Sequence, residues 1–241
     1  MHYDFKMKLN KLDSQQYKNL RIPEIDWVLN EAAELFVKMV AEPRLRSHLG
    51  FEKSQRNIDD IRTLVTDVEV AFINDVATLP TDYMYYLRGR VAMIKNCTKL
   101  GILKIKQHDD EYEISPFDTS SFEWGEVNGV FKSGGIVIED ANDFTVTSLK
   151  LSYIKQIDYM HDAEDFPGGT YNTLAGVALG GPGNPGTQDC ILPNQTHREV
   201  IDIAVLLVTG QLQMPDYQVK LAKLSLNNLK YFKTMKLKIT H

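Results

Sequence analysis

The chain of 241 residues is 43% hydrophobic and 24% charged, which is typical of a globular protein with one or two domains. Its longest uninterrupted apolar stretch, Ile203–Val208, falls far short of the ~20 residues of a membrane-spanning helix. The charged N-terminus also lacks the apolar core of a secretory signal. We therefore expect a soluble protein with no membrane partner, whose two cysteines, Cys97 and Cys190, are free thiols in a reducing compartment.

The net charge of −5 is distributed unevenly. Residues 1–21 contain five Lys or Arg and two Asp, and residues 219–241 contain six Lys and no acid. Residues 22–218 contain 16 basic and 30 acidic side chains. An acidic body with basic ends can pair with copies of itself or with an acidic neighbour, although solvated, poorly ordered ends are an equal alternative.

The first part of the chain predicts an arm followed by helices. Residues 1–21 are polar without clear periodicity, and we predict an N-terminal arm. From Pro23 to Pro43 apolar residues recur at helical spacing, which predicts a helix over 22–42. Asn57 can cap a second helical segment, so that the helical part extends over 22–66.

The middle of the chain alternates between apolar and polar residues. Short alternating runs separated by Asn, Asp and Gly predict strands at 68–72, 85–93, 102–106, 135–139 and 145–157. We predict an antiparallel β region over 67–160, as a sandwich or a small barrel.

The last part of the chain combines a long loop, a helix and a tail. The Gly/Pro-rich stretch 161–189 is too long for a simple connection, and we predict an extended loop there. Thr196 and Glu199 have the spacing of a capping box, and 190–213 is predicted to pack its apolar face on the helix 22–42. Residues 214–241 are predicted to form a basic tail. The predicted fold class is α+β: a helical bundle from the N- and C-terminal helices, an inserted antiparallel β-sandwich or barrel-like region, and extended arms and tail.

Few residues suggest chemistry. His108, Asp109, Asp110 and Glu111 could bind a metal. Neighbours on a strand point to opposite faces, so a solvated hairpin turn between Ile105 and Ile114 is favoured. The glycines of 180–186 lack the Lys-Ser/Thr of a phosphate loop. We expect no catalytic residue, no metal and no cofactor.

Two further patterns are ambiguous. Cys190 with the nearby His197 is weak evidence for a nucleophile. Asp158, His161-Asp162 and Glu164-Asp165 form an acidic patch that could bind calcium weakly, but the spacing of an EF-hand loop is absent. We expect this patch to face solvent or the lysines of a neighbouring molecule.

Several short motifs occur in an order that resembles one group of proteins. The motifs are Leu79-Pro80-Thr81-Asp82-Tyr83, His108-Asp109-Asp110 followed by Ser115-Pro116-Phe117, Leu149 to Lys155, and Asp189 to Pro193 followed by His197 to Val205. In this order they resemble head-to-tail connector ring proteins of crAss-like phages of gut Bacteroidales, over roughly residues 20–215. More distantly, the layout is similar to the adaptor, or tail tubular A-like, proteins of short-tailed phages. Gln156-Ile157-Asp158 departs from the pattern, where a proline is expected.

The resemblance implies a virion structural protein without enzymatic activity, made in the cytoplasm of the host bacterium. Copies would form a ring, a dodecamer, in the head-to-tail connector below the portal protein. Genomic DNA would pass the channel without sequence-specific binding, and other connector or tail proteins would bind the ring. The predicted arm, loop and tail would dock these partners. The interface residues expected there are Tyr171, Asn172, Leu174, Val177, Leu179, Tyr217, Lys220, Lys223, Lys230, Tyr231, Phe232 and Lys233.

Two other classes of function stay open on the sequence alone. A small enzyme would be centred on His108, Asp109 and Asp110, or on Cys190 and His197. A nucleic-acid-binding module would use the lysine tail and the tyrosines at 83, 85 and 86.

Overall fold

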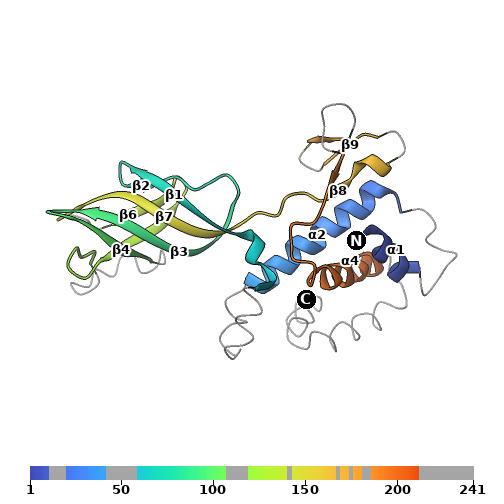
Figure 1. The fold of residues 1–241 in the computed structure, drawn as a ribbon, viewed down its shortest axis with the longest axis horizontal. Coiled ribbons are helices and arrows are strands. Elements are labelled where there is room, and N and C mark those ends of the chain that lie inside the picture. Colours follow the sequence, from blue (N-terminus) through green and yellow to red (C-terminus); the bar gives the residue numbers. More distant parts are fainter. Residues whose placement is uncertain are drawn as a thin grey trace, which may run out of the picture. The chain divides into compact units, whose positions relative to one another are not determined.

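The structure is a computed structural model. The protein belongs to the α+β class and contains a closed β-barrel (Figure 1). The structure describes residues 1–10, 20–41, 59–106, 119–139, 143–166, 169–173, 176–180 and 186–211. The chain forms two compact units, Met1–Thr63 with Ile157–His241, and Leu64–Gln156. The second unit is therefore inserted into the first, with borders a few residues before the expected 67 and 160.

The described residues of the first unit form three helices: α1 (His2–Asn10), α2 (Ile22–Ala41) and α4 (His197–Gln211). Helix α2 buries Ile25, Leu29, Ala32 and Phe36, the periodic residues that predicted it. Helix α4 lies against both α2 and α1. None of the described helices is long and apolar enough to cross a membrane.

The prediction of an arm over 1–21 is wrong for its first part, because His2–Asn10 is α1. Only Phe5 and Leu9 of this helix are apolar and deeply buried, and they stand one turn apart on the same face. Lys8 on this helix forms an ion pair with Asp202 of α4. Two buried residues make too weak a periodicity to be recognised in a polar sequence, and packing on α4 supplies the stabilisation. The rest of the predicted arm from residue 11 to 19 lies outside the described residues.

The second unit is a barrel of seven strands in the order β1-β2-β6-β5-β4-β3-β7. The strands are β1 (Val65–Ile73), β2 (Val76–Ala77), β3 (Tyr83–Ile94), β4 (Thr98–Ile105), β5 (Glu126–Lys132), β6 (Gly135–Glu139) and β7 (Thr145–Lys155). Alternate residues point inward, and Val91, Met93, Leu149 and Leu151 are fully buried in the core. A short 3-10 helix, η2 (Arg62–Leu64), precedes the barrel.

One strand pair corrects the prediction of an antiparallel β region. β4 and β5 are parallel, whereas the other barrel pairs are antiparallel. The chain between Ile105 and Glu126 is long enough to return to the starting end of β4, which a parallel pair requires. The hairpin expected between Ile105 and Ile114, with His108, Asp109 and Asp110, lies largely in residues outside those described.

Glycines and a tight turn close the barrel. Asn74 and Asp75 both have positive φ, 52° and 62°, and form the two-residue loop between β1 and β2 that matches the strand twist. Gly135 has φ 134°, and a Cβ there would lie 2.1 Å from the carbonyl oxygen of Ala77. Only glycine allows β6 to approach β2 this closely.

The predicted extended loop over 161–189 contains regular structure where it is described. β8 (His161–Asp162) pairs with β11 (Thr187–Gln188), and β9 (Tyr171–Asn172) pairs with β10 (Ala178–Leu179). A short 3-10 helix, η4 (Ala163–Asp165), follows β8. Strands of two residues are too short to show alternation, so the sequence shows only their glycines and prolines.

Candidate functional site

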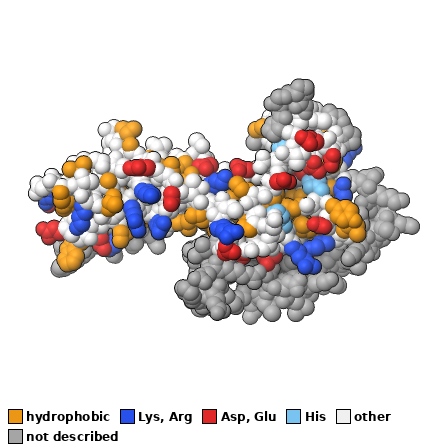
Figure 2. Space-filling model, viewed as in Figure 1, with side chains coloured by type: hydrophobic (Ala, Val, Ile, Leu, Met, Phe, Trp, Pro, Cys, Tyr) orange, Lys and Arg blue, Asp and Glu red, His pale blue; other side chains and the backbone are white. Residues whose placement is uncertain are grey.

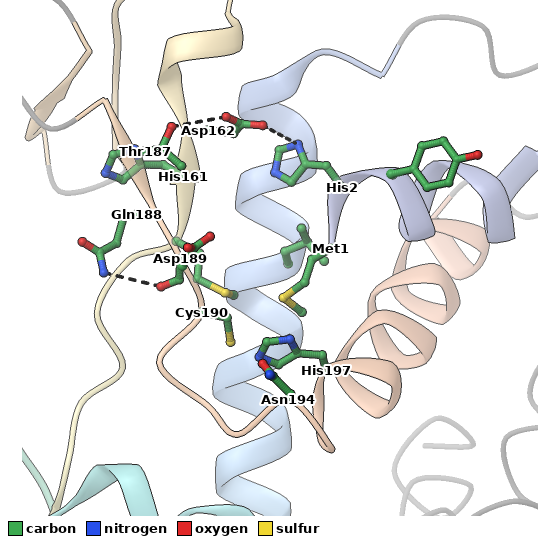
Figure 3. Close-up of a pocket in the computed structure, with 13 residues that line it drawn as sticks. Met1, His2, His161, Asp162, Thr187, Gln188, Asp189, Cys190, Asn194 and His197 are labelled. Atoms are coloured by element: carbon green, nitrogen blue, oxygen red, sulfur yellow. Dashed lines mark hydrogen bonds and ion pairs between the residues drawn. The ribbon is translucent and has the colours of Figure 1, made fainter.

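A pocket of about 530 Å³ lies in the first unit, among α1, α2, β8, β11 and the segment before α4 (Figure 3). Met1 and His2 of the N-terminus line one side, and Asp162, Thr187 and Asp189 line another. Cys190 and His197, the two residues considered for a nucleophilic site, both line it. The structure thus places both candidate residues in one pocket with other polar side chains.

A fully buried carboxylate, that of Asp26 on α2, connects the elements around this pocket. Its exposed fraction is 0%, and three donors surround it. His2 Nε2 lies 2.6 Å from Oδ1, the backbone N–H of Asp162 donates to Oδ2 at 3.2 Å, and the Tyr171 hydroxyl donates to the same oxygen. A buried charge is tolerated only with such partners, so this network joins α1, β8 and β9 to α2.

Asn30, one turn further along α2, extends this polar contact. Its Nδ2 donates to the carbonyl of Met160 at 2.7 Å, and its Oδ1 accepts from the N–H of Met160 at 2.8 Å. Asp26 and Asn30 therefore hold the backbone of the chain where it returns from the barrel. The apolar spacing of α2 predicts its contact with α4, but gives no sign of this polar contact.

The protonation of the tyrosines fits a structural role. Burial, together with the hydrogen bond to Asp26, raises the pKa of Tyr171, so its hydroxyl stays a donor. Burial and the nearby charge of Asp26 also raise the pKa of Tyr159. Both effects keep these phenols neutral beside the carboxylate.

Cys190 and His197 do not have the arrangement of an activated nucleophile. Burial raises the pKa of the Cys190 thiol, which disfavours the thiolate that a nucleophile needs. His197 Nε2 lies 2.9 Å from the carbonyl oxygen of Leu192, which fixes the ring at the start of α4. Within the described part of the chain no hydrogen bond joins the two side chains. His197 instead stabilises the segment that precedes α4.

His161 is the one pocket residue with an unexplained polar atom. The side chain is 5% exposed, and its Nδ1 has no hydrogen-bond partner among the described residues. Nor do any three His, Cys, Asp or Glu side chains converge there as metal ligands within the described ranges. The pocket therefore combines a polar lining with groups engaged mainly in holding the fold.

The predicted interface residues have different environments. Asn172 and Val177 are exposed at the β9–β10 hairpin, whereas Leu179 is 3% exposed and Tyr171 is bound to Asp26. The remaining ones lie outside the described residues: Leu174, Tyr217, Lys220, Lys223, Lys230, Tyr231, Phe232 and Lys233. Asn172 and Val177 are thus the described members that another molecule can reach directly.

A comparison with protein-family models found none that matches the chain, and a comparison with curated proteins found no significant sequence match.

Proposed function

We propose that this chain is a virion structural protein that forms a ring in the head-to-tail connector of a tailed phage, between the portal and the tail. Its copies assemble around a channel for the genome, and the protein acts as a structural subunit without catalysis. The observation that carries the proposal is the insertion of a β-barrel between α2 and α4, so that both flanking segments belong to one helical unit. This is the organisation that the resemblance to connector ring proteins implies.

Three of the motifs behind the resemblance fall near the borders of structural elements, while His108 to Asp110 and Ser115 to Phe117 lie outside the described residues. Leu79 to Tyr83 leads into β3, and Leu149 to Lys155 is the end of β7, the last barrel strand. Asp189 to Pro193 leads from β11 into α4. Motifs at such borders are expected where two proteins connect their helices and strands in the same order. They therefore support a common architecture more than a common reaction.

The helices supply the second part of the proposal. We infer that α1, α2 and α4 are the described part of a helical bundle, because α4 contacts both of the other helices. The hydrogen bonds of Asp26 to Asp162 and of Asn30 to Met160 then hold the segment after the barrel against this bundle. A rigid bundle of this kind suits a subunit that must hold a fixed angle to its neighbours in a ring.

The charge distribution supports head-to-tail assembly. A closed ring uses heterologous interfaces, in which one surface of a subunit binds a different surface of the next. The acidic composition of 22–218 and the basic composition of 219–241 provide two unlike regions in one chain. The portal protein and other connector or tail proteins would occupy the remaining faces.

The proposal is tested by cross-linking mass spectrometry, with protein quantification, on the native particle that contains this chain. We expect cross-links among its own copies and to a portal-like protein, at comparable copy number. Absence of the chain from the particle, or traces of it without self-links, would overturn the proposal.

A further inference from the structure

The outer face of the barrel presents an unusual row of side chains across four neighbouring strands. The register places Glu69 of β1 opposite Lys150 of β7, Lys150 opposite Arg90 of β3, and Arg90 opposite Ile102 of β4. All four side chains are exposed. Like charges directly opposite each other on paired strands are destabilising, so the Arg90 and Lys150 pair calls for an explanation.

In the part of the chain that the structure describes, no carboxylate forms an ion pair with Arg90. Lys150 at least has Glu69 on its other side, and Lys104 on β4 bonds Glu126 at 2.6 Å. Among the described residues Arg90 forms no ion pair, and its neighbour on β4 is Ile102. A guanidinium in this position is available to a carboxylate from outside, which it can bind in a bidentate geometry.

An apolar surface continues the row beyond Arg90. Leu100 and Ile102 on β4 are 69% and 61% exposed, and Trp124 in the turn before β5 is 83% exposed. The N–H of Ile102 donates to the carbonyl of Gly125 at 2.8 Å, which places this turn beside the strand. Exposed apolar residues that adjoin one another mark an interaction surface more often than isolated ones.

The turn that carries Trp124 is held firmly. Lys99 Nζ donates to the carbonyls of Phe122 and Glu123, at 3.0 and 2.6 Å. The N–H groups of Gly125 and Glu126 both donate to the carbonyl of Ser121. A large aromatic side chain on a rigid support loses little entropy on binding, and tryptophan is enriched at the energetic centres of interfaces.

The same chain contains a segment with complementary chemistry. Glu164 and Asp165 of η4 are exposed, and neither forms an ion pair among the described residues. Phe166, a partly exposed aromatic residue, follows them directly. Figure 2 shows Asp and Glu side chains gathered over the region of β8 and η4, and hydrophobic side chains exposed on the barrel.

We propose that the barrel face made by Arg90, Lys150, Leu100, Ile102 and Trp124 binds the η4 segment of a second copy of this chain. The carboxylates of Glu164 and Asp165 neutralise Arg90 and Lys150, and Phe166 packs on the apolar residues. Because the two surfaces differ, the contact is heterologous and can repeat from copy to copy. The inference deepens the proposed ring, and rests on it for the choice of a second copy as the partner.

The test uses the full chain and reversed charges. We expect the chain to self-associate in sedimentation velocity as its concentration rises, and the double variant Arg90→Glu with Lys150→Glu to weaken this association at least about tenfold. The double variant Glu164→Lys with Asp165→Lys is expected to weaken it equally. An equimolar mixture of the two variants should associate again, because the negative barrel face of one meets the positive η4 segment of the other. Glu34→Lys, an exposed reversal on α2, is the matched control and should leave association unchanged.

Fluorescence locates the contact. The chain has two tryptophans, so Trp27→Phe leaves Trp124 as the only one, and its emission should move to shorter wavelength on association. The inference is overturned if the chain stays monomeric at all concentrations, if either variant associates like the parent, if mixing fails to restore association, or if Trp124 emission does not move. Self-links in the native particle together with such a failure would leave the ring standing and remove only this interface. If the chain shows the charge-dependent association but is absent from the particle, this interface would stand and the proposed ring would fall.

Discussion

The hydroxyl of Tyr171 on β9 donates a hydrogen bond to the buried carboxylate of Asp26 on α2, across 145 residues of sequence. The barrel is inserted in the chain between these two residues, so the bond forms only after the chain has returned to the helices. Local sequence therefore contains no sign of it.

Asp26→Asn is expected to destabilise the helical unit. An amide cannot accept all three hydrogen bonds of the carboxylate, and a buried donor left without a partner costs roughly 1–3 kcal/mol. We expect the free energy of unfolding, measured by urea titration with circular dichroism, to fall by about this amount. Glu34→Gln on the same helix removes only an exposed ion pair with Lys38 and should change it by less than about 0.5 kcal/mol. Equal effects of the two changes would refute the role of Asp26.

Gly135→Ala should disrupt the barrel, whereas Gly134→Ala should be tolerated. A Cβ at Gly135 would lie 2.1 Å from the carbonyl oxygen of Ala77, in a backbone conformation with φ 134° that side chains rarely adopt. Strain and overpacking together predict a loss of roughly 2–5 kcal/mol. At the adjacent Gly134 the nearest atom is a methyl group of Val76 at 3.7 Å, which is ordinary contact. Thermal unfolding of both variants provides the comparison.

The barrel should lose stability at alkaline pH. Burial is the main reason that the pKa of Tyr86 rises to about 12, since only the neutral phenol is well accommodated. The unfolded chain releases this proton near pH 10, before the folded chain does, so stability is complete below pH 10 and declines as pH rises towards 12. Tyr86→Phe should flatten this decline between pH 9 and about 12, measured by urea unfolding at each pH. An unchanged slope in the variant would contradict the assignment.

The two cysteines should differ in reactivity. Cys97 is exposed in the β3–β4 hairpin, whereas Cys190 is partly buried and burial raises its pKa. Because the thiolate is the reacting species, we expect a disulfide reagent at pH 8 to modify Cys97 about tenfold faster or more. Mass spectrometry of peptides after timed quenching measures both rates, and Cys97→Ser should remove the fast phase. A fast reaction at Cys190 would reopen the nucleophile hypothesis.

Removal of residues 219–241 should abolish incorporation into the particle without unfolding the chain. The deletion takes away six lysines and no acid, and with them the basic region proposed to bind an acidic neighbour. Incorporation is measured by mass spectrometry of purified particles, and folding by circular dichroism. Replacing the six lysines by glutamine keeps the length and should have the same effect. Normal incorporation of the truncated chain would show that the tail has another role.

Local sequence patterns predict the elements of this fold that depend on local sequence. The apolar spacing between two prolines predicts helix α2, and alternation predicts β1, β3, β4, β6 and β7. β5 was missed because Asn128 and Gly129 suggest a turn. In the barrel Gly129 faces Leu103, and a Cβ there would lie 3.0 Å from that side chain. The glycine is required by packing against another strand, which no local pattern reveals.

The candidate pocket was only partly foreseeable. Cys190 and His197 stand close in sequence, so their shared position could be anticipated. The contacts of Asp26 with His2, Asp162 and Tyr171 combine segments far apart in the chain. An acid near the start of a helix suggests a favourable dipole interaction, and only the tertiary structure shows that it is buried instead.

The pairing of Val65 on β1 with Ile154 on β7 means that the chain enters and leaves the barrel on two adjacent strands. Residues paired in this way lie about 5 Å apart, a gap that a few linker residues can span. A domain whose two ends lie this close together is the kind that evolution can insert or remove with little change to the chain on either side. A lineage could therefore exchange it for another domain without redesigning the helical unit.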